Sequence, residues 1–221
     1  VTDGSATASG DVTGLFLSGA DTPLTYSMVS GTDATAALDG LPSLTSGDAT
    51  VLYNLTGNTL TAYVGTLTLE NTVFTFSIDN TSTGAYSFTL GPNPIDHATL
   101  NDDVAGDDTE NDLTLNLGAF VQAEDNDGDK VIAQADDIVA TVDDDMPKLT
   151  DTPVTFTVDE DFLANGIDDN SQPGDVTDGS ATASGDVTGL FLSGADTPLT
   201  YSMVSGTDAT AALDGLPSLT S

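Results

Sequence analysis

Residues 72–90 read TVFTFSIDNTSTGAYSFTL, and this stretch decides the fold class. Apolar and polar side chains alternate along residues 72–78, which is typical of a strand with one buried face. A polar turn follows over residues 79–84, and the alternation resumes over residues 86–90. Two alternating runs joined by a turn rich in Asn, Ser, Thr and Gly predict an antiparallel hairpin.

Strands of similar composition are predicted on both sides of this hairpin. They cover residues 24–29, 49–55, 59–64, 66–69, 113–117, 131–142 and 154–158. Only residues 33–38 favour a helix, and that segment is too short to form a stable helix independently. About nine or ten strands rich in Thr, Val, Tyr and Phe predict an all-β fold. We expect an antiparallel, immunoglobulin-like β-sandwich, somewhat larger than the usual ~100 residues.

The chain contains an internal repeat. Residues Val1–Ser46 and Val176–Ser221 are identical at every position, which predicts a tandem array with a 175-residue period. A solenoid unit has ~20–50 residues, so this period suits an array of whole domains. The acidic run and prolines after Val142 favour an extended linker there. Residues 1–146 are then most of one repeat without its first strand, and residues 147–221 begin the next.

Acidic residues dominate the charge. The chain has 36 Asp and Glu residues but only Lys130 and Lys148 as basic residues, so binding to nucleic acid is not expected. No apolar run approaches the ~20 residues of a membrane span, so direct insertion is not expected either. A halophilic surface or disorder would also explain acidity. However, 23 of the acids lie between Asp96 and Asp175, whereas residues 15–90 carry few charges and are rich in predicted strands.

The chain has no cysteine and one histidine, which limits the metals it can bind. Carboxylate oxygens are its main available ligands, and these suit hard cations such as Ca²⁺. Residues 125–129 read DNDGD and place Asp125, Asp127 and Asp129 at alternate positions of a predicted turn. The twelfth position counted from Asp125 is Asp136 rather than Glu, so this is not a standard EF-hand. We expect the three carboxylates to share one calcium ion; the alternative is a solvated acidic turn.

Two acidic runs flank the predicted junction between repeats. The candidate ligands are Asp143, Asp144 and Asp145 before it, and Asp159, Glu160 and Asp161 after the next strand. Like charges this close repel one another, so a bridging calcium ion would join the end of one repeat to the start of the next. The alternative is a flexible, solvated linker.

Two further acidic loops are weaker candidates for calcium binding. One contains Asp102, Asp103, Asp107 and Asp108, and the other contains Asp168 and Asp169. Long acidic loops are also commonly solvated without any metal ion. His97 follows Asp96, but no nucleophile motif accompanies the pair, so we do not expect an enzyme.

Several short motifs, in this order along the chain, resemble the extender repeats of bacterial RTX adhesins. They are residues 24–29 (LTYSMV), 94–97 (PIDH), 123–129 (AEDNDGD), 142–147 (VDDDMP) and 158–161 (VDED). The resemblance implies a calcium-binding β-sandwich, with ions at domain junctions that stiffen the array. It also implies type I secretion to the surface of a Gram-negative bacterium. The glycine-rich nonapeptide of the wider RTX group is absent from this chain.

The resemblance implies a structural spacer that projects a distal binding domain away from the cell. Its partners would be neighbouring repeats of the same chain. The alternative is that the repeat itself binds a glycan or another cell, which a glycan array would test. Identical copies favour the spacer, because repetition supplies length. We also expect head-to-tail self-association, because residues 147–221 carry the strand that residues 1–146 lack.

Overall fold

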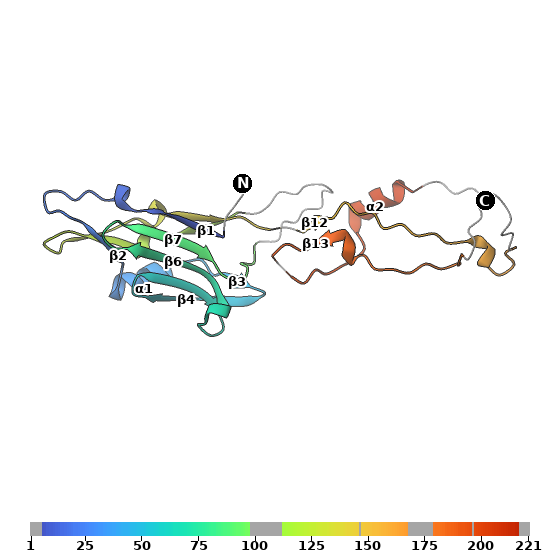
Figure 1. Ribbon diagram of the computed structural model, residues 1–221, viewed down its shortest axis with the longest axis horizontal. Helices are drawn as coiled ribbons and strands as arrows, with labels where there is room; N and C mark the ends of the chain where they lie inside the picture. The colour runs from blue at the N-terminus through green and yellow to red at the C-terminus, as the bar shows by residue number, and fades with distance from the viewer. Residues whose placement is uncertain (1–5, 98–111, 146, 168–178, 196, 217–221) are drawn as a thin grey trace. The chain divides into compact units, whose positions relative to one another are not determined.

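The computed structural model describes residues 6–97, 112–145, 147–167, 179–195 and 197–216 (Figure 1). The chain forms two compact units. The large unit contains residues 1–145 and 200–221, and the small unit contains residues 146–199. Among the described residues, none of the helices has the length and apolar character that a membrane crossing requires.

A six-stranded antiparallel sheet forms most of the large unit, in the order β1-β7-β6-β5-β4-β3. Its strands are β1 (Thr7–Asp11), β3 (Thr45–Ser46), β4 (Ala49–Thr56), β5 (Thr59–Val64), β6 (Thr72–Asn80) and β7 (Ala85–Leu90). The hairpin that decided the fold class is therefore confirmed as β6–β7. Gly57, in the β4–β5 turn, has a φ of 59°, which is the left-handed conformation that glycine adopts most easily.

Five further strands complete the β-structure of the large unit. Strands β2 (Thr25–Met28), β9 (Val121–Glu124) and β10 (Lys130–Ile132) form a sheet in the order β10-β9-β2. Strands β8 (Leu113–Asn116) and β11 (Val139–Val142) pair with each other. All of these pairings are antiparallel. The predicted all-β, antiparallel character is thus observed in the large unit.

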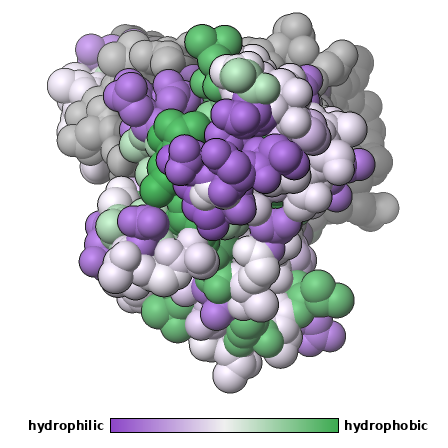
Figure 2. Space-filling model, turned by 90° about the vertical axis from the view of Figure 1, so that its left-hand side faces the viewer, coloured by the Kyte–Doolittle hydropathy of each residue, from purple (hydrophilic) through white to green (hydrophobic). Residues whose placement is uncertain are grey.

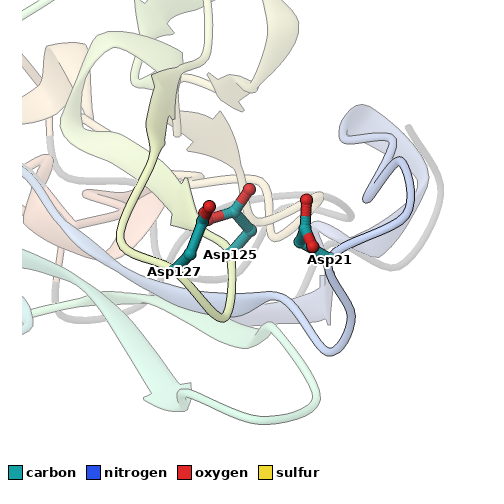
Figure 3. A group of neighbouring side chains, drawn as sticks. All are labelled: Asp21, Asp125 and Asp127. Atoms are coloured by element: carbon teal, nitrogen blue, oxygen red, sulfur yellow. The ribbon is translucent and has the colours of Figure 1, made fainter.

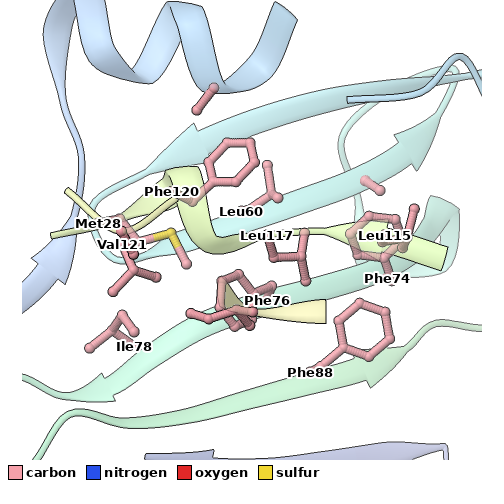
Figure 4. Close-up of a cluster of buried hydrophobic side chains, with 14 of the residues drawn as sticks. Met28, Leu60, Phe74, Phe76, Ile78, Phe88, Leu115, Leu117, Phe120 and Val121 are labelled. Atoms are coloured by element: carbon pink, nitrogen blue, oxygen red, sulfur yellow. The ribbon is translucent and has the colours of Figure 1, made fainter. Parts of the chain in front are cut away.

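One hydrophobic core joins these sheets (Figure 4). The six-stranded sheet contributes Leu60, Phe74 and Phe76, which are completely buried. Strand β8 and the 3₁₀ turn Gly118–Phe120 contribute Leu115 and Phe120 to the same core. Full burial of such a side chain is worth about 1.5–3 kcal/mol, so this shared core is what holds the separate sheets together.

Helix α1 (Gly31–Asp39) corrects one expectation from the sequence. It has nine residues, which is longer than the predicted helical segment 33–38. Ala37 is buried, and Ala34 and Leu38 pack against the core. Tertiary packing therefore stabilises a helix that would be marginal in isolation.

Three strand predictions are wrong. The predicted strand 66–69 is irregular chain leading into the 3₁₀ turn Leu69–Asn71. The predicted strand 131–142 is interrupted by the 3₁₀ turn Ala135–Asp137, which divides it between β10 and β11. Residues 154–158 form no strand, although their side chains alternate as a strand would require. Conversely, strands β1, β3 and β9 of the large unit were not predicted.

The Asp96 side chain stabilises the tight turn between β3 and β4 by hydrogen bonds. Its Oδ1 accepts a hydrogen bond from the Gly47 N–H (2.7 Å), and its Oδ2 accepts one from the Asp48 N–H (2.9 Å). Burial alone would raise the pKa of Asp96, but hydrogen bonds from the Thr45 side chain and the two N–H groups bring it below the usual value. The ionised carboxylate therefore stabilises this turn.

We expect Asp96→Asn to cost about 1 kcal/mol of unfolding free energy at pH 7, because an amide oxygen replaces a charged acceptor. A carboxyl with a lowered pKa stabilises the fold above its unfolded pKa of about 3.9 and loses this effect as the pH falls. The gap between wild type and Asp96→Asn should accordingly narrow as the pH falls below about 4, through the lowered pKa of the folded state. Urea unfolding of both proteins between pH 7 and pH 3 measures this difference in unfolding free energy. A gap that is independent of pH would contradict this role.

The small unit is a long, loosely paired ribbon. Strand β12 (Lys148–Leu149) pairs antiparallel with β13 (Phe191–Leu192). Beyond β12, the Thr150 N–H donates to the Leu190 carbonyl (2.9 Å), and the Asp159 N–H donates to the Ser180 carbonyl (2.9 Å). Residues 150–159 therefore lie antiparallel to residues 180–190.

The repeated sequence adopts different structures in its two positions. Helix α2 (Gly206–Asp214) reproduces α1, but residues 182–186 and 200–203 form no strands, unlike their counterparts β1 and β2. Strand β1 pairs with β7 and β2 pairs with β9, and the printed sequence holds only one copy of β7 and β9. The strands therefore depend on partners outside the repeated segment, whereas the helix forms from local hydrogen bonds.

Candidate metal site

Two loops meet at one end of the large unit. Strands β2 and β9 are antiparallel neighbours, with Thr25 opposite Glu124. The loop before β2 consequently lies beside the turn between β9 and β10. The Asn126 N–H donates to the Asp21 carbonyl across this gap (3.4 Å). Figure 2 looks at this end of the large unit, where hydrophilic residues gather beside a strip of hydrophobic ones.

The β9–β10 turn is held by its own hydrogen bonds. The Asp125 N–H donates to the Asp129 carbonyl (3.0 Å). The Asp125 Oδ1 accepts from the N–H groups of Gly128 (3.1 Å) and Asp129 (2.9 Å). Beside the turn, the Lys130 ammonium pairs with the Glu124 carboxylate at 3.1 Å. These contacts fix the backbone from which the acidic side chains project.

Asp21, Asp125 and Asp127 form an acidic triad (Figure 3). Each offers one carboxylate oxygen, and the three oxygens lie within 4.8 Å of one another. Asp125 is half-buried, and the other two side chains are exposed. The triad joins a loop near the start of the chain to a turn about 100 residues later, and these residues could hold a metal ion.

The electrostatics of the triad show the effect of crowding these carboxyls. A hydrogen bond between the Asp125 and Asp127 side chains, followed by repulsion from the Asp125 charge, raises the pKa of Asp127 above its usual value. The same hydrogen bond lowers the pKa of Asp125. A bound cation would supply positive charge that offsets the repulsion between these carboxylates.

The donor set fits a hard cation. All three side chains supply carboxylate oxygens, which Ca²⁺ and Mg²⁺ prefer, whereas structural zinc sites use mainly Cys and His. Ca²⁺ takes 6–8 oxygen ligands at 2.3–2.6 Å in flexible geometry. Three carboxylates, completed by carbonyl oxygens and water, could satisfy this ion.

The triad differs in one residue from the site expected from the sequence. Asp125 and Asp127 are brought together as expected, but Asp129 is not part of the triad, and Asp21 occupies its place. Asp21 could not be identified from its own surroundings, because only the pairing of β2 with β9 brings it to the turn. The only feature of the sequence that points to Asp21 is its position just before the predicted strand 24–29.

The other candidate ligands are distributed between the two units. Asp143, Asp144 and Asp145 end the large unit's last described segment before the linker, and Asp144 Oδ1 lies 3.9 Å from His97 Nδ1. In the small unit, Asp159 Oδ1 accepts a hydrogen bond from the Asp161 N–H (3.0 Å), and Glu160 begins a 3₁₀ turn. The remaining candidates lie outside the described residues: Asp102, Asp103, Asp107, Asp108, Asp168 and Asp169.

A matched pair of variants tests the membership of the triad. We expect Asp21→Asn to weaken calcium binding at least tenfold, because it removes one of three charges facing the ion. Asp129→Asn removes the same charge from the adjacent turn and should change the affinity less. Isothermal titration calorimetry with calcium measures both. If Asp129→Asn weakened binding more than Asp21→Asn, the ligands would be those suggested by sequence spacing instead.

The chain was compared with protein-family models, curated proteins and solved structures. No protein-family model, no curated protein and no solved structure matches this chain.

Proposed function

We propose that this chain is part of a calcium-stabilised extender array of a bacterial cell-surface adhesin. In this role, identical domains set the distance between the cell and a distal ligand-binding domain. The array would be exported by type I secretion from a Gram-negative bacterium and would act outside the cell. The internal repeat supports this proposal, because identical copies supply length.

The observation that carries the calcium dependence is the acidic triad. Its three carboxylates come from two loops far apart in sequence, so a cation there would fasten the start of the domain to its last hairpin. Extracellular modules commonly bind calcium with dissociation constants of about 10⁻⁴–10⁻³ M. A site with three carboxylates that is open to solvent suits this range.

The finer architecture that we propose is an immunoglobulin-like β-sandwich. The six-stranded sheet and the separate smaller sheets contribute side chains to one hydrophobic core, which supports two packed layers. Stable sheets that share a core would give each repeat a fixed length, which a spacer requires.

Calcium at the junction between repeats is the second part of the proposal. The large unit's last described segment before the linker ends in Asp143–Asp145, and the small unit carries further acids at residues 159–161. Without a cation, the adjacent charges within each run would repel one another and favour a flexible connection. A bound ion would stiffen it.

Small-angle scattering from a protein of several whole repeats tests this stiffening. We expect a larger maximum dimension in millimolar calcium than in chelator, because repeats joined by bound ions cannot bend freely. Replacement of Asp143, Asp144 and Asp145 by Asn is the matched control and should remove the difference. Equal maximum dimensions of the unsubstituted protein in calcium and in chelator would contradict the spacer function.

A further inference from the structure

The base of the turn between β9 and β10 is closed by an ion pair. Lys130 lies opposite Glu124 in the register of the two strands, and the Lys130 Nζ lies 3.1 Å from the Glu124 Oε2. These residues flank the turn 125–129, which supplies two of the three carboxylates of the acidic triad (Figure 3). One positive charge therefore lies at the edge of the candidate metal site.

The Glu124 carboxylate lies between the Lys130 ammonium and the turn. Its Oε2 is paired with Lys130, and its Oε1 lies 3.9 Å from the point that a Cβ on Gly128 would occupy. The exposed fractions of the Lys130 and Glu124 side chains are 50% and 38%, and an ion pair this exposed contributes little to stability. Its larger effect is expected on a cation that binds to the turn.

Lys130 is one of only two basic residues in a chain with 36 acidic residues. Beside it, the end of β9 and the two loops of the site carry five carboxylates, which are those of Asp21, Glu124, Asp125, Asp127 and Asp129. Neighbouring charges of like sign repel one another, and a nearby positive charge offsets part of this repulsion. Lys130 supplies such a charge when no metal ion is bound.

We propose that Lys130 is an internal counter-ion of the acidic triad, and that its charge lowers the affinity of the site for calcium. In the metal-free protein, the ammonium offsets the repulsion among the carboxylates. In the calcium-bound protein, the same charge repels the ion. Both effects favour the metal-free state, so Lys130 sets the affinity without being a ligand. This inference rests on the proposed calcium binding at the triad.

The size of the effect follows from Coulomb's law. Three residues of chain lead from Asp127 to Lys130, and they span at most about 11 Å. At about that distance in water, one unit charge changes the affinity for a divalent cation by roughly threefold to fourfold. The Debye length falls from about 30 Å at 0.01 M salt to about 3 Å at 1 M, so added salt should remove most of this effect.

Isothermal titration calorimetry with calcium at about 0.01 M ionic strength tests the proposal. We expect Lys130→Gln to bind calcium about threefold more tightly than wild type, because the charge that repels the ion is removed. Lys130→Arg keeps the charge and should bind calcium as wild type does. At about 1 M salt, the affinities of wild type and Lys130→Gln should converge.

Thermal melts of the same variants distinguish this role from a structural one. In chelator, Lys130→Gln should melt slightly lower than wild type, because the metal-free turn has lost its counter-ion. At equal calcium concentrations, its melting temperature should rise more than that of wild type, because it binds calcium more tightly. A side chain that only held the hairpin together would lower both melting temperatures and leave the calcium affinity unchanged.

The proposal is overturned if Lys130→Gln binds calcium no more tightly than wild type at low ionic strength. It is also overturned if Lys130→Arg binds as tightly as Lys130→Gln, since the charge would then not be the cause. In both cases, calcium binding by the wild type would leave the proposed function intact. A wild-type chain that binds no calcium would instead contradict the proposed function, together with this inference.

Discussion

With calcium at a hundredfold excess over its dissociation constant, the large unit is expected to melt about 5–10 °C higher than in chelator. A ligand that binds only the folded state adds about 2.7 kcal/mol at that excess. For a domain near 150 residues, each kcal/mol of added unfolding free energy raises the melting temperature by roughly 2–4 °C. The acidic triad supplies such a folded-state site, because Asp21 reaches Asp125 and Asp127 only when β2 pairs with β9.

Ionic strength must be kept constant in this measurement, because the chain carries a formal net charge of −34. Any salt screens that repulsion and stabilises the fold to some degree. Asp21→Asn is the matched control and should lose most of the shift while melting normally in chelator. Equal melting temperatures of the wild type in calcium and in chelator would show that the triad is only a solvated acidic surface.

The second large effect concerns the core, and the repeated sequence supplies its control. Met28 is 4% exposed in β2, and its counterpart Met203 is 91% exposed. We expect Met28→Ala to lower the unfolding free energy by about 2–5 kcal/mol, through lost burial and a cavity. Met203→Ala changes the same sequence context and should stay within about 0.5 kcal/mol of wild type.

Urea unfolding followed by far-ultraviolet circular dichroism measures both variants. Their compositions are identical, so differences in unfolded-chain properties largely cancel in the comparison. If the two variants were destabilised equally, the second copy would be as well packed as the first in solution. The different exposure of the two methionines would then not describe the folded protein.

The strands most accurately predicted are those in which apolar and polar residues alternate along the sequence. Strands β5, β6 and β7 combine alternation with Gly-containing turns, and the sequence places them within two residues of their true ends. Strand β1 has no buried side chain and contains a glycine, so it shows no alternation to detect. It is a strand only because β7 lies beside it.

The difference between the acidic triad and the site expected from the sequence has a similar cause. The spacing of residues 125–129 correctly indicated an acidic turn, since a turn is local. The third carboxylate comes from Asp21, whose place depends on which strands pair across the chain. Residues 154–158 illustrate the opposite error, because they have a strand-like pattern but no assigned strand pairing in the described residues.

The pairing of β2 with β9 also has a consequence for the order of folding. Strands β4 to β7 are consecutive hairpins, which form rapidly, whereas Thr25 and Glu124 are 99 residues apart. The sheet that carries the acidic triad should therefore assemble after the transition state. An interaction absent from the transition state slows unfolding and leaves the folding rate nearly unchanged. Calcium would then act mainly by lengthening the lifetime of the folded domain.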